Sequence, residues 1–262
     1  MIKFFRKIRQ KMLTENKFSK YLLYSVGEIV LVVIGILIAL SINNWNESKK
    51  DRVQEIKNFK NIQQDILLDT VDIMYNVKYH KLFQTSQKQL LNYLHSKDLQ
   101  PKEIIKYELA LGTPIFLTLH ESSFTNLKDY NINIISNQEL KKQISNHYDN
   151  ISKVMLRVEN DLEPYKTYIF LKPYFLKHFS NVNKVSKLGD TEFNNEDYYN
   201  AETTLNTLIL TDTLGLKNNR AFKIDLAESI AYTGFKIDMY KHLLKAIYTL
   251  NDSINNELKK IE

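Results

Sequence analysis

Cysteine is absent from the 262-residue chain, and glycine and proline are scarce, with 6 and 4 residues. Without cysteine, neither a disulfide framework nor a thiolate nucleophile or metal ligand is available. Turn-rich β-sheet proteins need many glycines and prolines, so their scarcity favours helices joined by few connections. The apolar fraction of 44% is ordinary for a chain that folds. We therefore expect an all-α protein.

The excess of positive charge is confined to residues 1–20. This segment carries seven basic side chains against Glu15 alone, whereas the rest of the chain holds 29 basic and 29 acidic side chains. Nucleic-acid binding requires a basic surface on the folded domain, so we expect no nucleic-acid partner. The segment has an apolar face opposite its basic one, which is typical of a helix lying on an anionic membrane surface. The alternative, which we weigh equally, is that these basic residues only set the orientation of a membrane helix.

An apolar run from Tyr21 to Ile42 contains one ionisable residue, Glu28. At about 1.5 Å per residue its length is about 33 Å, enough for a hydrocarbon core of roughly 30 Å. Its Leu, Ile and Val residues favour insertion by about 4 to 8 kcal/mol in sum, against about 3 kcal/mol for one charge. With Tyr24 and Trp45 at the two interfaces, we expect a transmembrane helix over residues 21–45.

The flanking charges predict the orientation of this helix. Seven basic residues precede it, and five follow within a similar distance. The positive-inside rule therefore places the N-terminus in the cytoplasm and residues 46–262 outside it. A cleaved signal peptide is the alternative, because Ala39-Leu40-Ser41 loosely fits a cleavage site. The 20-residue arm and Trp45 favour a retained anchor.

Three residues of the apolar run are candidates for a helix–helix contact in the membrane. Gly35 and Ala39 form a small-xxx-small pair, and Glu28 lies on nearly the same face. A carboxylate inside a membrane is a functional-site hypothesis in its own right. The alternative is that Glu28 lies one turn inside the boundary and reaches the headgroups.

Residues 46–262 predict an elongated, mostly helical bundle. Residues 46–95 contain neither Pro nor Gly and show an amphipathic pattern, so one long helix is expected there, ending at Ser96–Pro101. From Leu226 to Ile261 apolar residues recur at alternating spacings of four and three, the pattern of a coiled coil or a bundle seam. We favour packing against the helix that starts near Val53 over a coiled coil between chains.

Shorter elements are expected between these two helices. Pro164 and Pro173 flank an aromatic stretch that we expect to be helical and buried, and the polar segment 181–200 is expected to be a loop. The remaining predictions are a short helix at 102–111, a helix start or a strand at Thr113-Pro114, a helix at Ser122–Tyr130, and a capping box at Ser136–Glu139 in which Ser136 caps and Glu139 reaches back.

No catalytic, cofactor-binding or metal-ligating residue is predicted. None of the six histidines follows a Glu by three residues, and no two are three or four residues apart, so neither di-iron nor zincin spacing occurs. Phosphate-binding and nucleophile-elbow motifs are also absent from the sequence. We expect no metal or cofactor, and the sequence leaves enzymatic activity open while favouring a non-enzyme.

Two stretches resemble an uncharacterised family of N-terminally anchored membrane proteins of Bacteroidota, chiefly flavobacteria, defined only as a domain of unknown function. The first contains Gly27-Glu28-Ile29, Val32–Leu40 and Ile42–Glu47. The second follows the family pattern at Phe124, Leu127, Ile135, Ser136, Asn137, Leu140 and Tyr148, although the family often has Gly in the turn that here reads Tyr130–Asn133. The resemblance implies a Gram-negative inner membrane and a periplasmic domain, and no activity.

The leading functional hypothesis is a single-pass inner-membrane protein that serves as a non-enzymatic binding, sensing or scaffold module. Its expected partners are the lipid bilayer and a second copy or another envelope protein. About twenty residues are expected in the cytoplasm, so any signal would pass through a partner. One alternative is a membrane-proximal enzyme with an unrecognised site, which would require a deep pocket lined by convergent polar groups. Another is an oligomeric membrane helix that handles protons or ions through Glu28.

Overall fold

A computed structural model describes residues 18–102, 104–160, 166–187 and 204–262. The chain divides into two compact units, residues 1–57 and 58–262. The predicted basic amphipathic arm lies almost wholly outside the described residues.

The first long helix, α2, extends from Phe18 to His95 without interruption. Proline is absent from this segment, so nothing removes a backbone hydrogen bond or forces a kink. The helix ends where the amide of Ser96 donates to the carbonyl oxygens of Asn92 and Tyr93. The predictions of one continuous helix and of a break at Ser96 are both confirmed.

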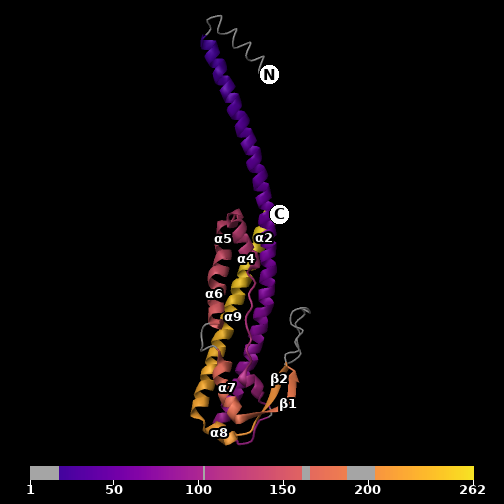
Figure 1. Cartoon of the computed structure of the whole chain (residues 1–262), viewed down its shortest axis with the longest axis vertical. Coiled ribbons are helices and arrows are strands. Elements are labelled where there is room, and N and C mark those ends of the chain that lie inside the picture. Colours follow the sequence, from indigo (N-terminus) through magenta and orange to yellow (C-terminus); the bar gives the residue numbers. More distant parts are fainter. Residues whose placement is uncertain (1–17, 103, 161–165, 188–203) are drawn as a thin grey trace. The chain divides into compact units, whose positions relative to one another are not determined.

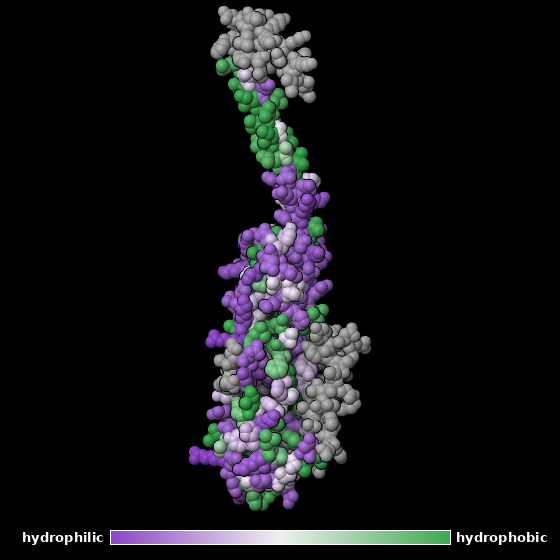
Figure 2. Space-filling model, in the orientation of Figure 1, coloured by the Kyte–Doolittle hydropathy of each residue, from purple (hydrophilic) through white to green (hydrophobic). Residues whose placement is uncertain are grey.

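In the first unit, α2 exposes a long apolar surface. Between Ser25 and His95, α2 contains an 18-residue stretch with a mean hydropathy of 2.6, and no part of that stretch is buried. Leu31 is 72% exposed and Trp45 is 68% exposed, and Figure 2 shows the hydrophobic band on the visible face. By length and composition, this helix is able to cross a membrane. The side chain of Tyr24 lies outside the description.

In the second unit, α9 (Arg220–Ile261) lies antiparallel beside the second half of α2 (Figure 1). Gln63 Nε2 donates to Asn251 Oδ1 over 3.0 Å near one end, and Gln84 Nε2 donates to the Ile230 carbonyl over 3.0 Å nearer the other. The predicted packing of the C-terminal helix inside its own domain is therefore confirmed. Most of the predicted seam is buried: Leu226, Thr233, Ile237, Tyr240, Ile247, Ile254 and Leu258.

Among the described residues, six short elements lie between α2 and the aromatic helix. They are α3 (Tyr107–Leu111), α4 (Ser122–Asn131), the 3₁₀ turn η1 (Ile132–Ile134), α5 (Gln138–Asn146), the π-helical turn η2 (His147–Ile151) and α6 (Ser152–Asn160). The helix predicted at Ser122–Tyr130 is confirmed. The helix predicted at 102–111 is confirmed only in its second half, and residues 113–121 form neither a helix nor a strand.

The predicted capping box is wrong by one residue. Asn137, not Ser136, caps α5, because its Oδ1 accepts from the amide of Leu140 over 3.1 Å. With Asn137 as the cap, Glu139 is the second helical residue, one position short of that from which a side chain reaches back to the cap amide. Asn137 Nδ2 also donates to Glu257 Oε2 over 2.7 Å, which ties the start of α5 to α9.

The aromatic stretch forms α7 (Thr167–His178), with Pro173 inside it. Leu171 and Phe175 are buried, but Ile169 is 57% exposed and Leu176 is 74% exposed, so the prediction of a buried helix is wrong for one face.

A two-stranded antiparallel hairpin follows, formed by β1 (Phe179–Lys187) and β2 (Thr204–Leu210), with Phe179 opposite Leu210. The predicted loop is therefore wrong over residues 181–187, and its remainder lies outside the described residues. Apolar and polar residues alternate only weakly in β1, which explains why the strand was not predicted from the sequence. Apart from this hairpin, the regular secondary structure of the described residues is helical, as expected.

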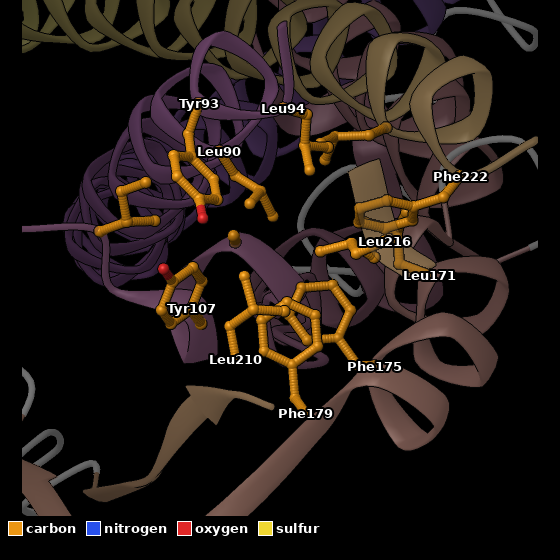
Figure 3. Packing of buried hydrophobic residues seen from close by; sticks show 13 residues of the cluster. Leu90, Tyr93, Leu94, Tyr107, Leu171, Phe175, Phe179, Leu210, Leu216 and Phe222 are labelled. Carbon is orange, nitrogen blue, oxygen red and sulfur yellow. The ribbon is translucent and has the colours of Figure 1, made fainter. Parts of the chain in front are cut away.

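A hydrophobic cluster lies where the end of α2, α3, α7, the hairpin, α8 (Thr213–Asn218) and the start of α9 meet (Figure 3). Its buried members are Leu90, Tyr93, Leu94, Ile105, Tyr107, Ala110, Leu171, Phe175, Phe179, Leu210, Leu216, Phe222 and Leu226. Phe175 stacks on Phe179, with ring centroids 4.4 Å apart, and meets Phe222 of α9 edge-on at 6.0 Å. Such pairs add about 0.5–1.5 kcal/mol each beyond the burial of their area. The cluster fixes α7 against α9, and α7 forms part of the wall of the candidate site.

Candidate ligand-binding site

Three buried aspartates of α2 hold the extended segment 113–121 and the start of α4 by their backbone amides. Asp72 Oδ2 accepts from the amide of Thr118 over 2.8 Å, and Asp69 Oδ1 accepts from the amide of His120 over 2.7 Å. One turn earlier, Asp65 Oδ2 accepts from the amide of Ser123 over 2.9 Å. We call these three residues the aspartate ladder. Hydrogen bonds to a charged acceptor contribute about 1.5–3 kcal/mol each.

Asp65, the first of the three aspartates in the sequence, also stabilises the N-terminus of a helix. Asp65 lies beside the first turn of α4, whose preceding residue Glu121 makes no side-chain cap. A carboxylate at that position satisfies an amide that has no partner within the helix and interacts favourably with the helix dipole.

Asp69 and His120 interact through side chains as well. His120 Nδ1 lies 2.9 Å from Asp69 Oδ1. Burial raises the pKa of Asp69 to about 6, although the hydrogen bonds from His120 act in the opposite direction. This carboxyl therefore titrates close to neutral pH.

A cavity of about 360 Å³ lies beside the start of this segment. Its walls come from α2, the residues that follow α3, the end of α6, the start of α7 and the middle of α9. The apolar lining consists of Phe83, Pro114, Ile115, Phe116, Tyr168 and Ile169. Phe116 is 68% exposed, so this large apolar side chain is open to solvent as well as to the cavity. A volume in this range is typical of small-molecule sites.

The backbone turns sharply at one lip of the cavity. Gly112, the residue after α3, has φ +79° and lines the cavity. An L-side chain is strained at this angle. A Cβ at this position would lie 3.6 Å from the Phe83 ring, an ordinary contact, so the requirement for glycine is conformational.

A buried ion pair forms the polar lining. Lys236 Nζ lies 3.1 Å from Glu159 Oε1, and both side chains are almost fully buried. Tyr240 donates its hydroxyl to the same carboxylate oxygen. Burial, followed by the charge of Glu159, raises the pKa of Tyr240 above its usual range, so its hydroxyl stays protonated. The two charges neutralise each other, and the pair presents no net charge to the cavity.

His80 is also a buried polar residue of the lining, as is Thr233. Its Nδ1 lies 2.8 Å from the carbonyl oxygen of Asn76, which only accepts, so Nδ1 carries the proton. Burial, reinforced by the nearby charge of Lys236, lowers the pKa of His80 to about 3. The ring is therefore neutral at physiological pH, and its Nε2 is a hydrogen-bond acceptor with no hydrogen-bonding partner among the described residues.

The family-like residues predicted from the sequence serve packing and capping. Phe124 of α4 stacks on Tyr148 of η2, with ring centroids 4.6 Å apart and an interplanar angle of 9°. Leu127 is fully buried, and Asn137 caps α5. The structure brings Phe124 and Tyr148 together and places neither in the lining of the cavity.

The membrane-contact candidates lie in the first unit. Ala39 is exposed, and a Cβ on Gly35 would meet no atom within 4 Å. Glu28 is half-buried. Their role as a helix–helix contact stays a prediction.

His80, Glu159 and Lys236 were not predicted as site residues from the sequence. One signal was present: Asp65, Asp69, Asp72, Asn76 and His80 recur at spacings of three and four, which places five polar residues on one face of a helix. A second signal was Thr233, a polar interruption of the C-terminal seam that lines the cavity beside Lys236. Within the described residues no group of three or more His, Asp or Glu is arranged to hold a metal ion.

These features define a class: a helical domain that carries an apolar helix at its N-terminus and a small-molecule-sized cavity between its helices. Residues 28–157 match DUF6090, a family of unknown function. No curated protein and no solved structure matches the chain. The matched region includes the apolar run from Glu28 onward and the aspartate ladder, whereas Glu159 and Lys236 lie beyond it. The similarity therefore covers the framework and only part of the cavity.

Proposed function

We propose that this protein is a single-pass inner-membrane protein whose domain outside the cytoplasm binds a small molecule in the cavity at His80 and the Lys236–Glu159 pair. The observation that carries the proposal is this cavity, in which buried polar groups converge among apolar walls. Natural ligand sites combine these two features.

Support for the membrane anchor comes from the exposed apolar stretch of α2. Burying this surface in lipid removes it from water, which is favourable by several kcal/mol. The basic residues before the helix favour a cytoplasmic N-terminus and, in a Gram-negative cell, a periplasmic domain. Fusing alkaline phosphatase after residue 262 tests the orientation, because the enzyme folds actively only outside the cytoplasm. An inactive fusion at normal abundance would contradict it.

The titration properties of the cavity favour binding over catalysis. General acid–base catalysis works best with a pKa near the operating pH. His80, with a pKa of about 3, is a weak base at pH 7, and Tyr240 holds its proton throughout the physiological range. An enzyme remains the second candidate, because a pocket with convergent polar groups is what the enzyme hypothesis requires.

Native mass spectrometry of the full chain purified from membranes tests the proposal. We expect a copurifying small molecule bound to the wild-type protein. Thr113→Trp, which fills the cavity from its wall, is expected to lack it. Tyr248→Trp on an exposed part of α9 is the matched control and keeps the ligand. A bound mass that survives Thr113→Trp would contradict the assignment to this cavity.

A further inference from the structure

We propose that the cavity selects an uncharged amphipathic molecule with an aromatic or alicyclic body and one hydrogen-bond donor, which bonds His80 Nε2. This inference rests on the proposed function and adds the chemical class of the ligand.

The donor requirement follows from the tautomer of His80. Its Nδ1–H is committed to the Asn76 carbonyl at 2.8 Å, which leaves Nε2 with a lone pair and no proton. The residue is 7% exposed and lines the cavity, so little of its side chain reaches bulk water. A ligand N–H or O–H that donates to Nε2 satisfies this acceptor when the ligand displaces water from the cavity.

The preference for an uncharged ligand follows from the ion pair. An anion near Lys236 would compete with Glu159, which lies 3.1 Å from the ammonium, and a cation would compete with Lys236 for Glu159. Breaking a buried pair leaves one charge uncompensated, which is strongly unfavourable. Among the described residues, Lys166 is the other charged member of the lining besides the ion pair; it is half-buried and has an interaction of its own.

The apolar body of the ligand is inferred from the side chains that form the cavity walls. Phe83 is buried behind Gly112, and Phe116 and Ile169 extend the apolar surface out to solvent. About 360 Å³ equals the share of about a dozen water molecules in the liquid, which fits a molecule of one to three rings. Aromatic walls favour flat ligands because rings stack or meet edge to face.

A set of four indoles separates these contributions in the full-length protein in nanodiscs. Indole is uncharged and only donates, 1-methylindole lacks the donor, 3-indoleacetate is an anion and tryptamine is a cation. By calorimetric titration we expect indole to bind about three- to tenfold more tightly than 1-methylindole, the worth of one hydrogen bond. Both charged indoles are expected to bind more weakly than indole and more weakly than 1-methylindole.

Two variants assign the effect to the cavity. His80→Phe keeps the ring volume and removes the acceptor, so indole and 1-methylindole are expected to bind equally. Phe116→Ala, at a residue 68% exposed, preserves folding and weakens both ligands alike; Phe235→Ala, 49% exposed on α9 and outside the lining, is its control. An unchanged preference for indole in His80→Phe would overturn the assignment.

The outcomes distinguish this inference from the proposed function. Tighter binding of 3-indoleacetate or tryptamine than of indole would overturn the uncharged class while leaving a ligand-binding cavity. Equal binding of indole and 1-methylindole to the wild type would overturn the donor requirement alone. Absence of binding by all four probes overturns the inference, and together with the absence of a copurifying molecule it removes the proposed function as well.

Discussion

The two halves of α2 reverse the usual placement of side chains. In the first unit its apolar residues are exposed, with Leu31 at 72%, whereas in the second its carboxylates are buried, with Asp69 at 1%. Exposed apolar surface of this extent is unfavourable in water, and buried charge is unfavourable without partners. The buried carboxylates of the second half are paired with the amides of another segment, and the exposed apolar surface of the first half supports the proposed membrane anchor.

The largest expected effect comes from placing charge on the apolar half. Leu31→Asp combined with Leu37→Asp introduces two carboxylates near the predicted midplane, at about 3 kcal/mol each. We expect the chain to leave the membrane fraction after carbonate extraction. Leu67→Asp, at a residue 61% exposed on the same helix in the second unit, is the control and is expected to remain in the membrane. Membrane retention of the double variant would refute the anchor.

Removing one carboxylate of the buried half has the next largest effect. Asp69→Ala leaves the His120 amide and ring without their acceptor, and we expect the free energy of unfolding to fall by about 3 kcal/mol. Asp238→Ala, at a carboxylate 69% exposed, is expected to change it by less than about 0.5 kcal/mol. Urea denaturation of the full chain in detergent measures both. Equal effects would show that the ladder contributes no more than a surface ion pair.

Acidification is expected to destabilise the second unit. Burial lowers the pKa of His80 to about 3 and that of His147 to about 4, so below pH 6.5 the unfolded chain binds protons that the folded chain does not. Asp69, with its pKa raised to about 6, acts in the opposite direction between pH 6 and 4, but its shift is smaller than the two histidine shifts together.

We therefore expect a net loss of roughly 2 kcal/mol between pH 7 and pH 5. Urea midpoints at the two pH values measure it. His80→Gln combined with His147→Gln is expected to remove the loss and leave a smaller gain of stability at pH 5, because only the raised pKa of Asp69 then acts. Higher stability at pH 5 than at pH 7 in the wild type would reverse the sign and contradict neutral, buried histidines.

The smallest effect concerns the glycines of the two regions. Gly112→Ala forces an L-side chain to φ +79°, and we expect it to lower the free energy of unfolding by about 1 kcal/mol. Gly35→Ala, in the apolar half where a Cβ meets no atom within 4 Å, is expected to leave the domain's unfolding unchanged. Urea denaturation of the two variants measures both changes. A larger loss of stability in Gly35→Ala than in Gly112→Ala would contradict the conformational requirement for glycine at position 112.

Periodicity predicted the long elements well, because both α2 and the seam of α9 repeat over many turns. Local signals were weaker: the cap of α5 lies at Asn137 rather than Ser136, since both residues are good caps. The hairpin was missed because its strands carry little alternation. The cavity could not be predicted, since His80, Glu159 and Lys236 come from three elements and meet only through tertiary packing.

The aspartate ladder accepts hydrogen bonds from main-chain amides, and this has an evolutionary consequence. Any residue except proline supplies the amide at positions 118, 120 and 123. The segment that begins as a wall of the cavity is thus free to change its side chains while its path is kept by α2. Related proteins are expected to retain Asp65, Asp69 and Asp72 while varying at Ile115 and Phe116, so that new ligand preferences arise on an unchanged frame.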